Sequence, residues 1–204
     1  MTESNNLLQD TSDLYGDEII FVLENLRVNP NDFWSRSLIR LCISLFEAEV
    51  FILKKNLLKY CKEYNVPIKP EISTLLAGIK YEINDNGKVA ERYFQIKMVS
   101  DIKFVFDQLR GIRGFTLKNK FSDSRWQCME KTVKVRNRLV HPKLIEEQIV
   151  SEIEVNDCMS AYWWFSENIN HIAEQELNFL EQETTNLKSK LKKLQLDITK
   201  RQRS

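Results

Sequence analysis

The sequence predicts an all-α fold, in the form of an up-and-down bundle of four or five helices. The chain of 204 residues has only five glycines and four prolines, so it carries few turn signals, which favours long helices over many short strands. Hydrophobic residues make up 43%, which is typical of a globular protein with a buried core. Apolar residues recur every three or four positions along most of the chain, which is the period of an amphipathic helix.

The first 30 residues are predicted to lie outside the bundle. Residues 1–15 are polar and acidic, so we expect a loose tail, and residues 17–27 then show the apolar spacing of a short helix. The sequence Asn-Pro-Asn-Asp at 29–32 ends this helix and caps the next one.

A long helix is expected from about Asp32 to about Tyr64, and prolines after it end the helical pattern. Its predicted apolar stripe contains Trp34, Leu38, Leu41, Leu45, Ala48, Phe51, Ile52 and Leu58, with Lys55 as the one exception. A further helical stretch is expected over 71–81. An Asn-Gly pair between alternating residues then predicts a small β-hairpin near 81–93, for which an exposed loop is the alternative.

The second half of the chain predicts three more helices. The first runs over about 95–109, the second follows a Ser-Asp cap at 122–123, and the third is capped by Asn156. The third continues as a predicted coiled coil over 174–204. Its heptad has Leu177, Thr184, Leu191 and Ile198 at position a, and Leu180, Leu187 and Leu194 at position d. The bundle itself is expected over 31–173.

Composition narrows the function classes. The net charge of +1 shows that the whole protein is not a polycation, so nucleic-acid contact would need a local basic patch. No apolar run reaches 18 residues, and the polar start does not resemble a signal peptide, so we expect a cytoplasmic protein without membrane contact. With four scattered cysteines and two histidines, we expect neither a metal site nor a cofactor.

The most informative residues lie near the end of the helix after 123. Arg136 shares a predicted helical stripe with Trp126 and Met129, where a guanidinium is costly unless an anion meets it. Pro142 disfavours helical geometry for His141, so we expect His141 at the helix exit, near Arg136. A guanidinium is always charged and an imidazole exchanges a proton near neutral pH, so the two together suit phosphate chemistry.

The segment Arg136-Asn137-Arg138-Leu139-Val140-His141 resembles the R-x4-H signature of HEPN domains, including the polar residue after the arginine. The resemblance implies a metal-independent endoribonuclease that leaves 2′,3′-cyclic phosphate ends. It also implies a homodimer in which two motifs form one composite active site. A role in a toxin, in abortive infection or in other antiviral defence, with an inhibitory partner protein, is implied by the family alone.

The resemblance also assigns roles to residues. His141 would be the general acid or base, Arg136 would hold the phosphate, and Asn137 would orient His141 or a phosphate oxygen. Residues 110–143 contain ten Lys or Arg and two acidic residues, an excess of eight positive charges that suits an RNA backbone. Within it, the expected RNA-binding residues are Arg125, Lys134, Arg138 and Lys143.

Two other interpretations remain open. The chain would be a non-catalytic HEPN-like module that binds RNA, a nucleotide or a protein partner, or a helical scaffold in which the motif is accidental. In the second case His141 would only cap its helix, where a histidine interacts favourably with the helix dipole. The basic stretch would then be a solvated face, and the predicted coiled coil would pack on its own bundle.

Overall fold

The structure is a computed structural model that describes residues 2–201, with side-chain detail for 10–196 and for Ile198. Its helices are α1 (Thr2–Val28), α2 (Asp32–Glu63), α3 (Pro70–Ala77), α4 (Met98–Gln108), α5 (Ser124–Val140) and α6 (Glu152–Arg201). Strands β1 (Ile79–Ile83) and β2 (Val89–Tyr93) pair as an antiparallel hairpin. Two single turns, η1 (Leu109–Arg113) and η2 (Ile145–Gln148), complete the described elements. The predicted all-α fold with a small hairpin is confirmed.

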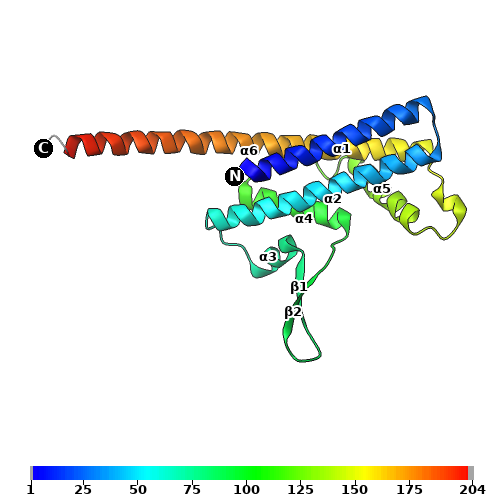
Figure 1. The fold of residues 1–204 in the computed structure, drawn as a ribbon, viewed down its shortest axis with the longest axis horizontal. Coiled ribbons are helices and arrows are strands. Elements are labelled where there is room, and N and C mark those ends of the chain that lie inside the picture. The colour runs from blue at the N-terminus through cyan, green and yellow to red at the C-terminus, as the bar shows by residue number, and fades with distance from the viewer. Residues whose placement is uncertain (1, 202–204) are drawn as a thin grey trace.

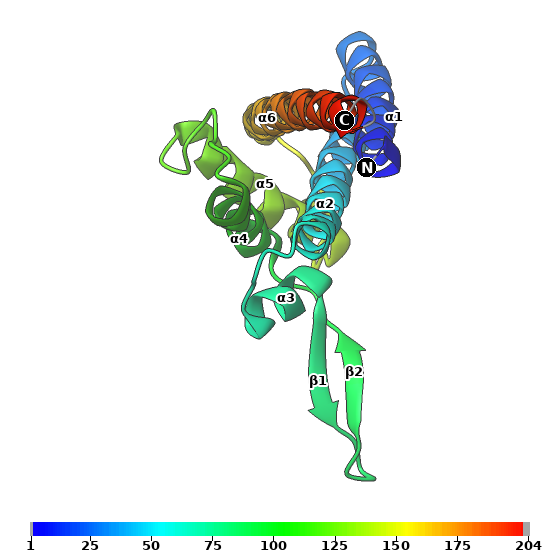
Figure 2. The ribbon, with the colours of Figure 1, turned by 90° about the vertical axis from the view of Figure 1, so that its left-hand side faces the viewer.

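Helix α2 lies at the centre of the bundle. Helices α1, α4, α5 and α6 all contact it, and α5 packs along the first part of α6 (Figure 1). Helix α3 and the hairpin project from one side of the bundle, as the end-on view shows (Figure 2). The second half of α6 extends well beyond the other helices (Figure 1).

Aromatic rings fill the middle of the core. The ring centroids of Phe46 and Phe165 are 4.5 Å apart, and those of Trp126 and Trp164 are 4.8 Å apart. Phe106 packs against both Trp164 and Phe165. Each fully buried side chain of this size contributes roughly 1.5–3 kcal/mol to folding, so this cluster fixes how α2, α4, α5 and α6 meet.

The loose tail predicted for residues 1–15 is wrong, because α1 is continuous from Thr2 to Val28. Ile19 and Val22 are buried in the same core as the other helices, and Ser12 donates a hydrogen bond to the buried Glu49 on α2. Packing against α2 therefore stabilises a helix whose polar sequence alone does not predict it.

The predicted stripe of α2 is partly wrong. Phe51 is 55% exposed and Lys55 is exposed, whereas Lys54 is buried with its Nζ 2.6 Å from the Asp101 carboxylate. Because α2 is contacted from several sides, its buried residues do not follow one narrow face. The observed bounds of α2 agree with the predicted helix.

Helix caps explain most of the helix starts. The Asn31 side chain accepts from Trp34 N at 3.2 Å, as predicted for α2. Helix α6 begins before the predicted cap at Asn156, because Ser151 and Glu154 cap each other. Glu154 N donates to Ser151 Oγ at 3.3 Å, and Ser151 N donates to Glu154 Oε2 at 2.9 Å. This reciprocal capping box satisfies two otherwise unpaired backbone N–H groups.

The hairpin is confirmed, with Ile79 paired to Tyr93 and Ile83 to Val89. It begins before residue 81 because α3 ends at Ala77, where Gly78 adopts a left-handed conformation with φ 67°. Nearly all of its side chains are exposed, so the hairpin contributes little to the core. Over residues 2–201, no helix is long and apolar enough to cross a membrane.

Candidate functional site at the end of α5

Helix α5 positions the predicted motif. Asp123 caps its start by accepting from Arg125 N at 2.8 Å, and Trp126 and Met129 anchor it in the core. The helix ends at Val140, and His141 follows with non-helical backbone angles, as predicted from Pro142. The His141 side chain is exposed. In the part of the chain with side-chain detail, its imidazole has no hydrogen-bond or ion-pair partner.

Asn137 links the two outer residues of the motif. Its side-chain Oδ1 accepts from Arg136 Nη1 at 3.3 Å, and its backbone carbonyl accepts from His141 N at 3.1 Å. Asn137 therefore contacts the side chain of Arg136 and, through the last main-chain bond of α5, the backbone of His141.

Arg136 lies beside the buried face of α5, not on it. The buried positions continue from Met129 through Thr132, Val135 and Leu139, whereas the Arg136 side chain is 31% exposed. Its Nη2 lies 3.3 Å from Oε1 of Glu47, which α2 supplies. The anion expected for this guanidinium is therefore present within the chain.

The predicted RNA-binding residues divide into two pairs. Arg138 donates to Glu154 Oε1 and to the carbonyl of Ile149, both at 2.9 Å. Although burial raises it, hydrogen bonds from Arg138 and Ser151 hold the pKa of Glu154 below its ordinary value. Arg138 therefore fastens the start of α6 to α5, which is a structural role.

Arg125 has a similar structural role. It donates to Asn119 Oδ1 at 2.9 Å and forms ion pairs with Asp123 and Glu167. Hydrogen bonding from Arg125 lowers the pKa of Asp123. By contrast, Lys134 and Lys143 are exposed, so they remain open to a phosphate group.

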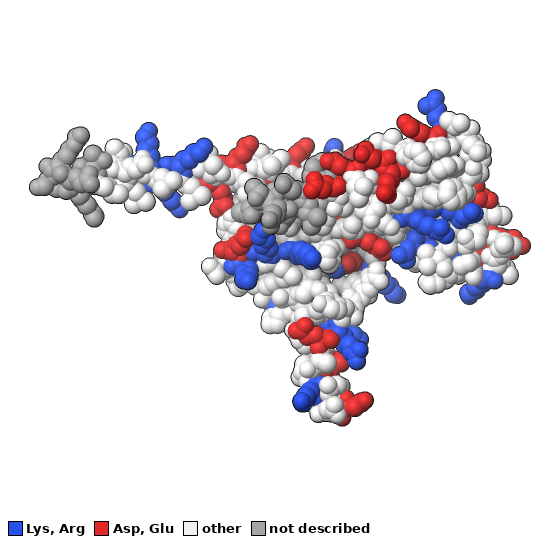
Figure 3. Space-filling view, viewed as in Figure 1, with Lys and Arg blue, Asp and Glu red and all other residues white. Residues whose placement is uncertain are grey.

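Acidic residues from outside the basic stretch 110–143 compensate much of its charge. Seven of its ten cations form ion pairs with such residues: Arg110–Asp107, Arg113–Glu176, Lys118–Glu167, Arg125–Glu167, Lys131–Asp157, Arg136–Glu47 and Arg138–Glu154. On the face seen in Figure 3, red side chains gather over α1, and blue side chains form separate groups with white surface between them. The excess counted along the sequence is therefore not an excess of unpaired cations in space.

An exposed apolar surface adjoins His141. We call it the apolar motif surface; its members are Val140 (45% exposed), Leu144 (65%), Ile145 (82%), Ile149 (56%) and Ile153 (73%). Its backbone is held in place, since Gln148 Nε2 donates to the Leu139 carbonyl and Arg36 Nη1 donates to the Gln148 carbonyl, both at 3.1 Å. Five large apolar side chains exposed within 14 residues favour a contact with another molecule.

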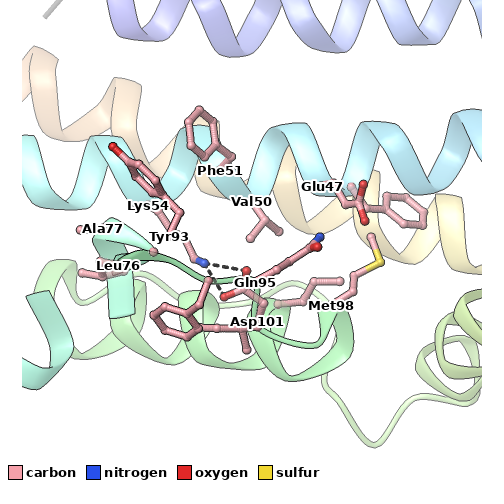
Figure 4. A pocket seen from close by; sticks show the side chains of 15 residues that line it. Glu47, Val50, Phe51, Lys54, Leu76, Ala77, Tyr93, Gln95, Met98 and Asp101 are labelled. Carbon is pink, nitrogen blue, oxygen red and sulfur yellow. Dashed lines mark hydrogen bonds and ion pairs between the residues drawn. The ribbon is translucent and has the colours of Figure 1, made fainter. Parts of the chain in front are cut away.

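A pocket of about 250 Å³ lies between α2, α3, β2 and α4. Its lining is mostly apolar, and the Lys54–Asp101 ion pair crosses it (Figure 4). Glu47, the partner of Arg136, also lines this pocket. These three charged residues could not be predicted from the sequence, because no local motif marks them; only a lysine inside an apolar stretch indicates a buried ion pair.

Among the side chains that the structure describes, no three His, Cys, Asp or Glu residues cluster as metal ligands. The four cysteines are free. Comparison with known proteins finds no matching family model, no similar curated protein and no similar solved structure. The HEPN assignment therefore stays a prediction that depends on the motif.

Proposed function

We propose that the protein is a metal-independent endoribonuclease of the HEPN type, acting in a toxin or phage-defence context in the cytoplasm. One observation carries the proposal: Arg136 and an exposed His141 stand at the same helix end and are joined through Asn137. This arrangement supplies one guanidinium and one accessible imidazole per chain, which are the two kinds of group that the proposed reaction needs.

In the proposed reaction, the ribose 2′-hydroxyl attacks the adjacent phosphorus atom. A new P–O2′ bond forms and the P–O5′ bond breaks, which leaves a 2′,3′-cyclic phosphate and a 5′-hydroxyl. His141 either removes the proton from the 2′-oxygen or gives one to the leaving 5′-oxygen, and a second imidazole would perform the other transfer. Arg136 stabilises the charge that develops on the non-bridging oxygens.

The need for a second imidazole is the reason to propose a homodimer with a composite active site. The apolar motif surface supports this, because a second copy that covered it would bring another Arg136 and His141 to the same place. Lys134 and Lys143 are the proposed RNA contacts around this cleft. Arg125 and Arg138, like Arg136, would have to exchange carboxylate contacts within the chain before they could bind a phosphate.

For Arg136 to hold a phosphate, it must exchange its contact with Glu47. The ion pair is partly exposed, with side-chain exposures of 31% and 35%, so it stabilises the fold by less than about 1 kcal/mol. A phosphate that accepts two parallel hydrogen bonds from a guanidinium competes well against such a pair.

The second candidate is a non-catalytic module that binds RNA, a nucleotide or a protein partner. The ion pairs of the 110–143 stretch favour this second candidate, because they leave fewer unpaired cations for an RNA backbone than the sequence indicates. The two candidates differ in one outcome, which is whether a phosphodiester bond is broken.

The decisive experiment incubates the protein with total RNA in excess EDTA and identifies the product ends. Arg136→Ala and His141→Ala are compared with Arg110→Ala, a matched control whose arginine is 72% exposed on another element. We expect cyclic phosphate ends from the wild type and from Arg110→Ala, and none from the two motif variants.

Two other results have clear meanings, provided that circular dichroism shows all variants folded. RNA binding without cleavage, lost in a motif variant, supports the non-catalytic module. Neither cleavage nor binding, in the wild type with broad RNA substrates and no inhibitory partner present, contradicts both candidates.

A further inference from the structure

Beyond Glu183, the rest of the bundle does not cover the side chains of α6 that the structure describes. The last contacts that fasten α6 to the bundle are the Arg113–Glu176 ion pair, at 2.6 Å, and a hydrogen bond from the Tyr64 hydroxyl to Glu183. From Thr184 onward, every side chain that the structure describes is exposed. We call residues 177–198 the tail of α6. The alternative that this segment packs back on its own bundle does not hold beyond Glu183.

The tail carries an apolar stripe that is open to solvent. Its exposed members are Leu177 (58%), Leu187 (58%), Leu191 (59%), Leu194 (59%) and Ile198 (56%), all at heptad positions a or d. The bundle contacts of Glu176 and Glu183, both at position g, leave these five side chains more than half exposed, whereas Leu180 at position d is half-buried. Most helical stability in proteins comes from packing of an apolar face, so burial of this leucine stripe against another helix would stabilise the tail.

Charge is sharply divided along the same segment. Residues 174–183 contain four glutamates and no basic residue, whereas residues 184–194 contain four lysines and no acidic residue. In a parallel in-register pair, position g of one chain faces position e of the other, which sets Glu176 against Glu181 of the second copy and Glu183 against its Lys188. An antiparallel pair sets each acidic half against a basic half, which identifies a reversed second copy as the complementary partner.

We propose that the tail of α6 pairs with the tail of a second copy in an antiparallel two-stranded coiled coil. Several registers let position a of each chain face position d of the other, and the one centred between residues 185 and 186 is the one that also sets Glu181 against Lys188 of the second copy. Leu177 then packs on Leu194 of the second copy, Leu180 on its Leu191, and Thr184 on its Leu187. At position e, Glu181 faces Lys188 of the second copy, and symmetry repeats each of these contacts.

This pairing has a consequence for the proposed active site. The symmetry axis of the register crosses α6 between residues 185 and 186. Glu154, which is paired with Arg138 of the motif, lies far from this axis near the start of α6. At 1.5 Å per residue, the two motifs of a tail-joined pair are about 95 Å apart. The tail therefore cannot build the composite cleft, which has to form through the apolar motif surface. The tail proposal does not rest on the ribonuclease proposal.

The first test measures mass in solution by light scattering over a range of concentrations. Leu187→Glu with Leu191→Glu places charge in the stripe, so we expect the mass to fall to half of the wild-type value. Leu196→Glu is the matched control, because Leu196 is a leucine of the same helix, 55% exposed but off the stripe. A monomeric wild type overturns the proposal. So does a result in which the stripe variant and Leu196→Glu change the mass equally, or in which neither changes it.

The second test determines the direction of pairing. Under oxidising conditions, a mixture of Leu177→Cys and Leu194→Cys chains should form mixed disulfide-linked dimers, and neither variant alone should cross-link efficiently. Dimers of Leu177→Cys with itself would indicate a parallel pair and overturn the antiparallel proposal. The unmodified chain, with its own cysteines buried or half-buried, controls for other cross-links.

Glu181→Lys gives an independent readout of direction. In the antiparallel pair it turns two attractive contacts with Lys188 into repulsive ones, so we expect about tenfold weaker association. Adding Lys188→Glu should restore the affinity. In a parallel pair, Glu181→Lys would instead remove a repulsion with Glu176 and tighten association, which contradicts the proposal. RNA cleavage by the same tail variants is also measured. A variant that is monomeric and still cleaves RNA would contradict the composite cleft, but not the pairing of the tails.

Discussion

Arg136 and Glu47, separated by 89 residues in the sequence, meet at 3.3 Å and join the end of α5 to α2. The contact explains how a guanidinium is accommodated next to the core without a ligand. It also places Glu47 in two environments at once, since one side faces the motif and the other lines the pocket between α2 and α4. The motif is therefore linked to the core by an ion pair whose two side chains are partly exposed, so Arg136 can exchange Glu47 for another anion.

Replacement of Glu47 by Gln should separate the contribution of the ion pair to stability from its effect on RNA binding. We expect the free energy of unfolding to fall by less than about 1 kcal/mol, because a partly exposed ion pair contributes little. RNA affinity should rise if Arg136 contacts phosphate, because Arg136 is then no longer paired. Urea unfolding and filter binding measure the two quantities. Glu63→Gln, which removes an exposed ion pair with Lys59, is the control, and a lower RNA affinity of Glu47→Gln would contradict the prediction.

Glu49 should make the stability fall as the pH rises. Burial raises the pKa of Glu49 to about 7, partly opposed by a hydrogen bond from Ser12. Because its pKa in the folded state is above the value of about 4.5 for the exposed group, the protonated form is favoured by folding. The stabilisation is complete below about pH 4.5 and is lost as the pH rises through 7.

Glu49→Gln should therefore flatten this dependence and raise stability at pH 8, by at most about 3 kcal/mol. Thermal unfolding at pH 5, 6, 7 and 8 measures the effect. A variant whose stability changes with pH as steeply as that of the wild type would show that another group is responsible.

Arg113 should be the arginine most important for stability. Its side chain is only 6% exposed, lies 2.6 Å from Glu176, and stacks on Tyr60 with its guanidinium carbon 4.0 Å from the ring centroid. Arg113→Ala leaves Glu176 unpaired and removes these contacts, so we expect a loss of about 3 kcal/mol in urea unfolding. Arg110→Ala, at an exposed arginine nearby, should cost less than about 0.5 kcal/mol; equal losses would argue against a special role for Arg113.

Asn168 should be essential for the segment between η1 and α5. It is fully buried, its Nδ2 donates to the Trp164 carbonyl, and its Oδ1 accepts from Asn119 N, both at 3.0 Å. Asn168→Ala leaves a backbone N–H without its partner, so we expect a loss of about 2 kcal/mol and faster amide exchange at Asn119. Asn170→Ala, at an exposed asparagine of the same helix, should change neither quantity.

Local signals predicted the parts of the fold that local interactions determine. The Asn31 and Asp123 caps and the Asn-Gly turn are each set by contacts within four residues, and the helices and hairpin that they define were predicted. Helix α1 was not predicted over residues 2–15, because its stability depends on contact with α2. The true cap of α6, Ser151, was missed because Asn156 offers a similar local signal.

The site was predicted less completely, for a physical reason. The end of α5 at His141 follows from Pro142, so that placement was predictable. The partners of Arg125, Arg136 and Arg138 come from other helices, and nothing near these arginines in the sequence identifies them. Charge counted along a sequence does not predict which charges remain unpaired after folding.

The ion pairs of the 110–143 stretch also determine how a bound polyanion would respond to ionic strength. Binding to RNA weakens with salt in proportion to the counterions that free cations displace from phosphates. An arginine such as Arg138, already paired with Glu154, would exchange a carboxylate for a phosphate, so it would contribute little to the salt dependence of binding. The slope of log affinity against log salt should therefore report unpaired lysines such as Lys134 and Lys143, and it should be shallow for so basic a stretch of sequence.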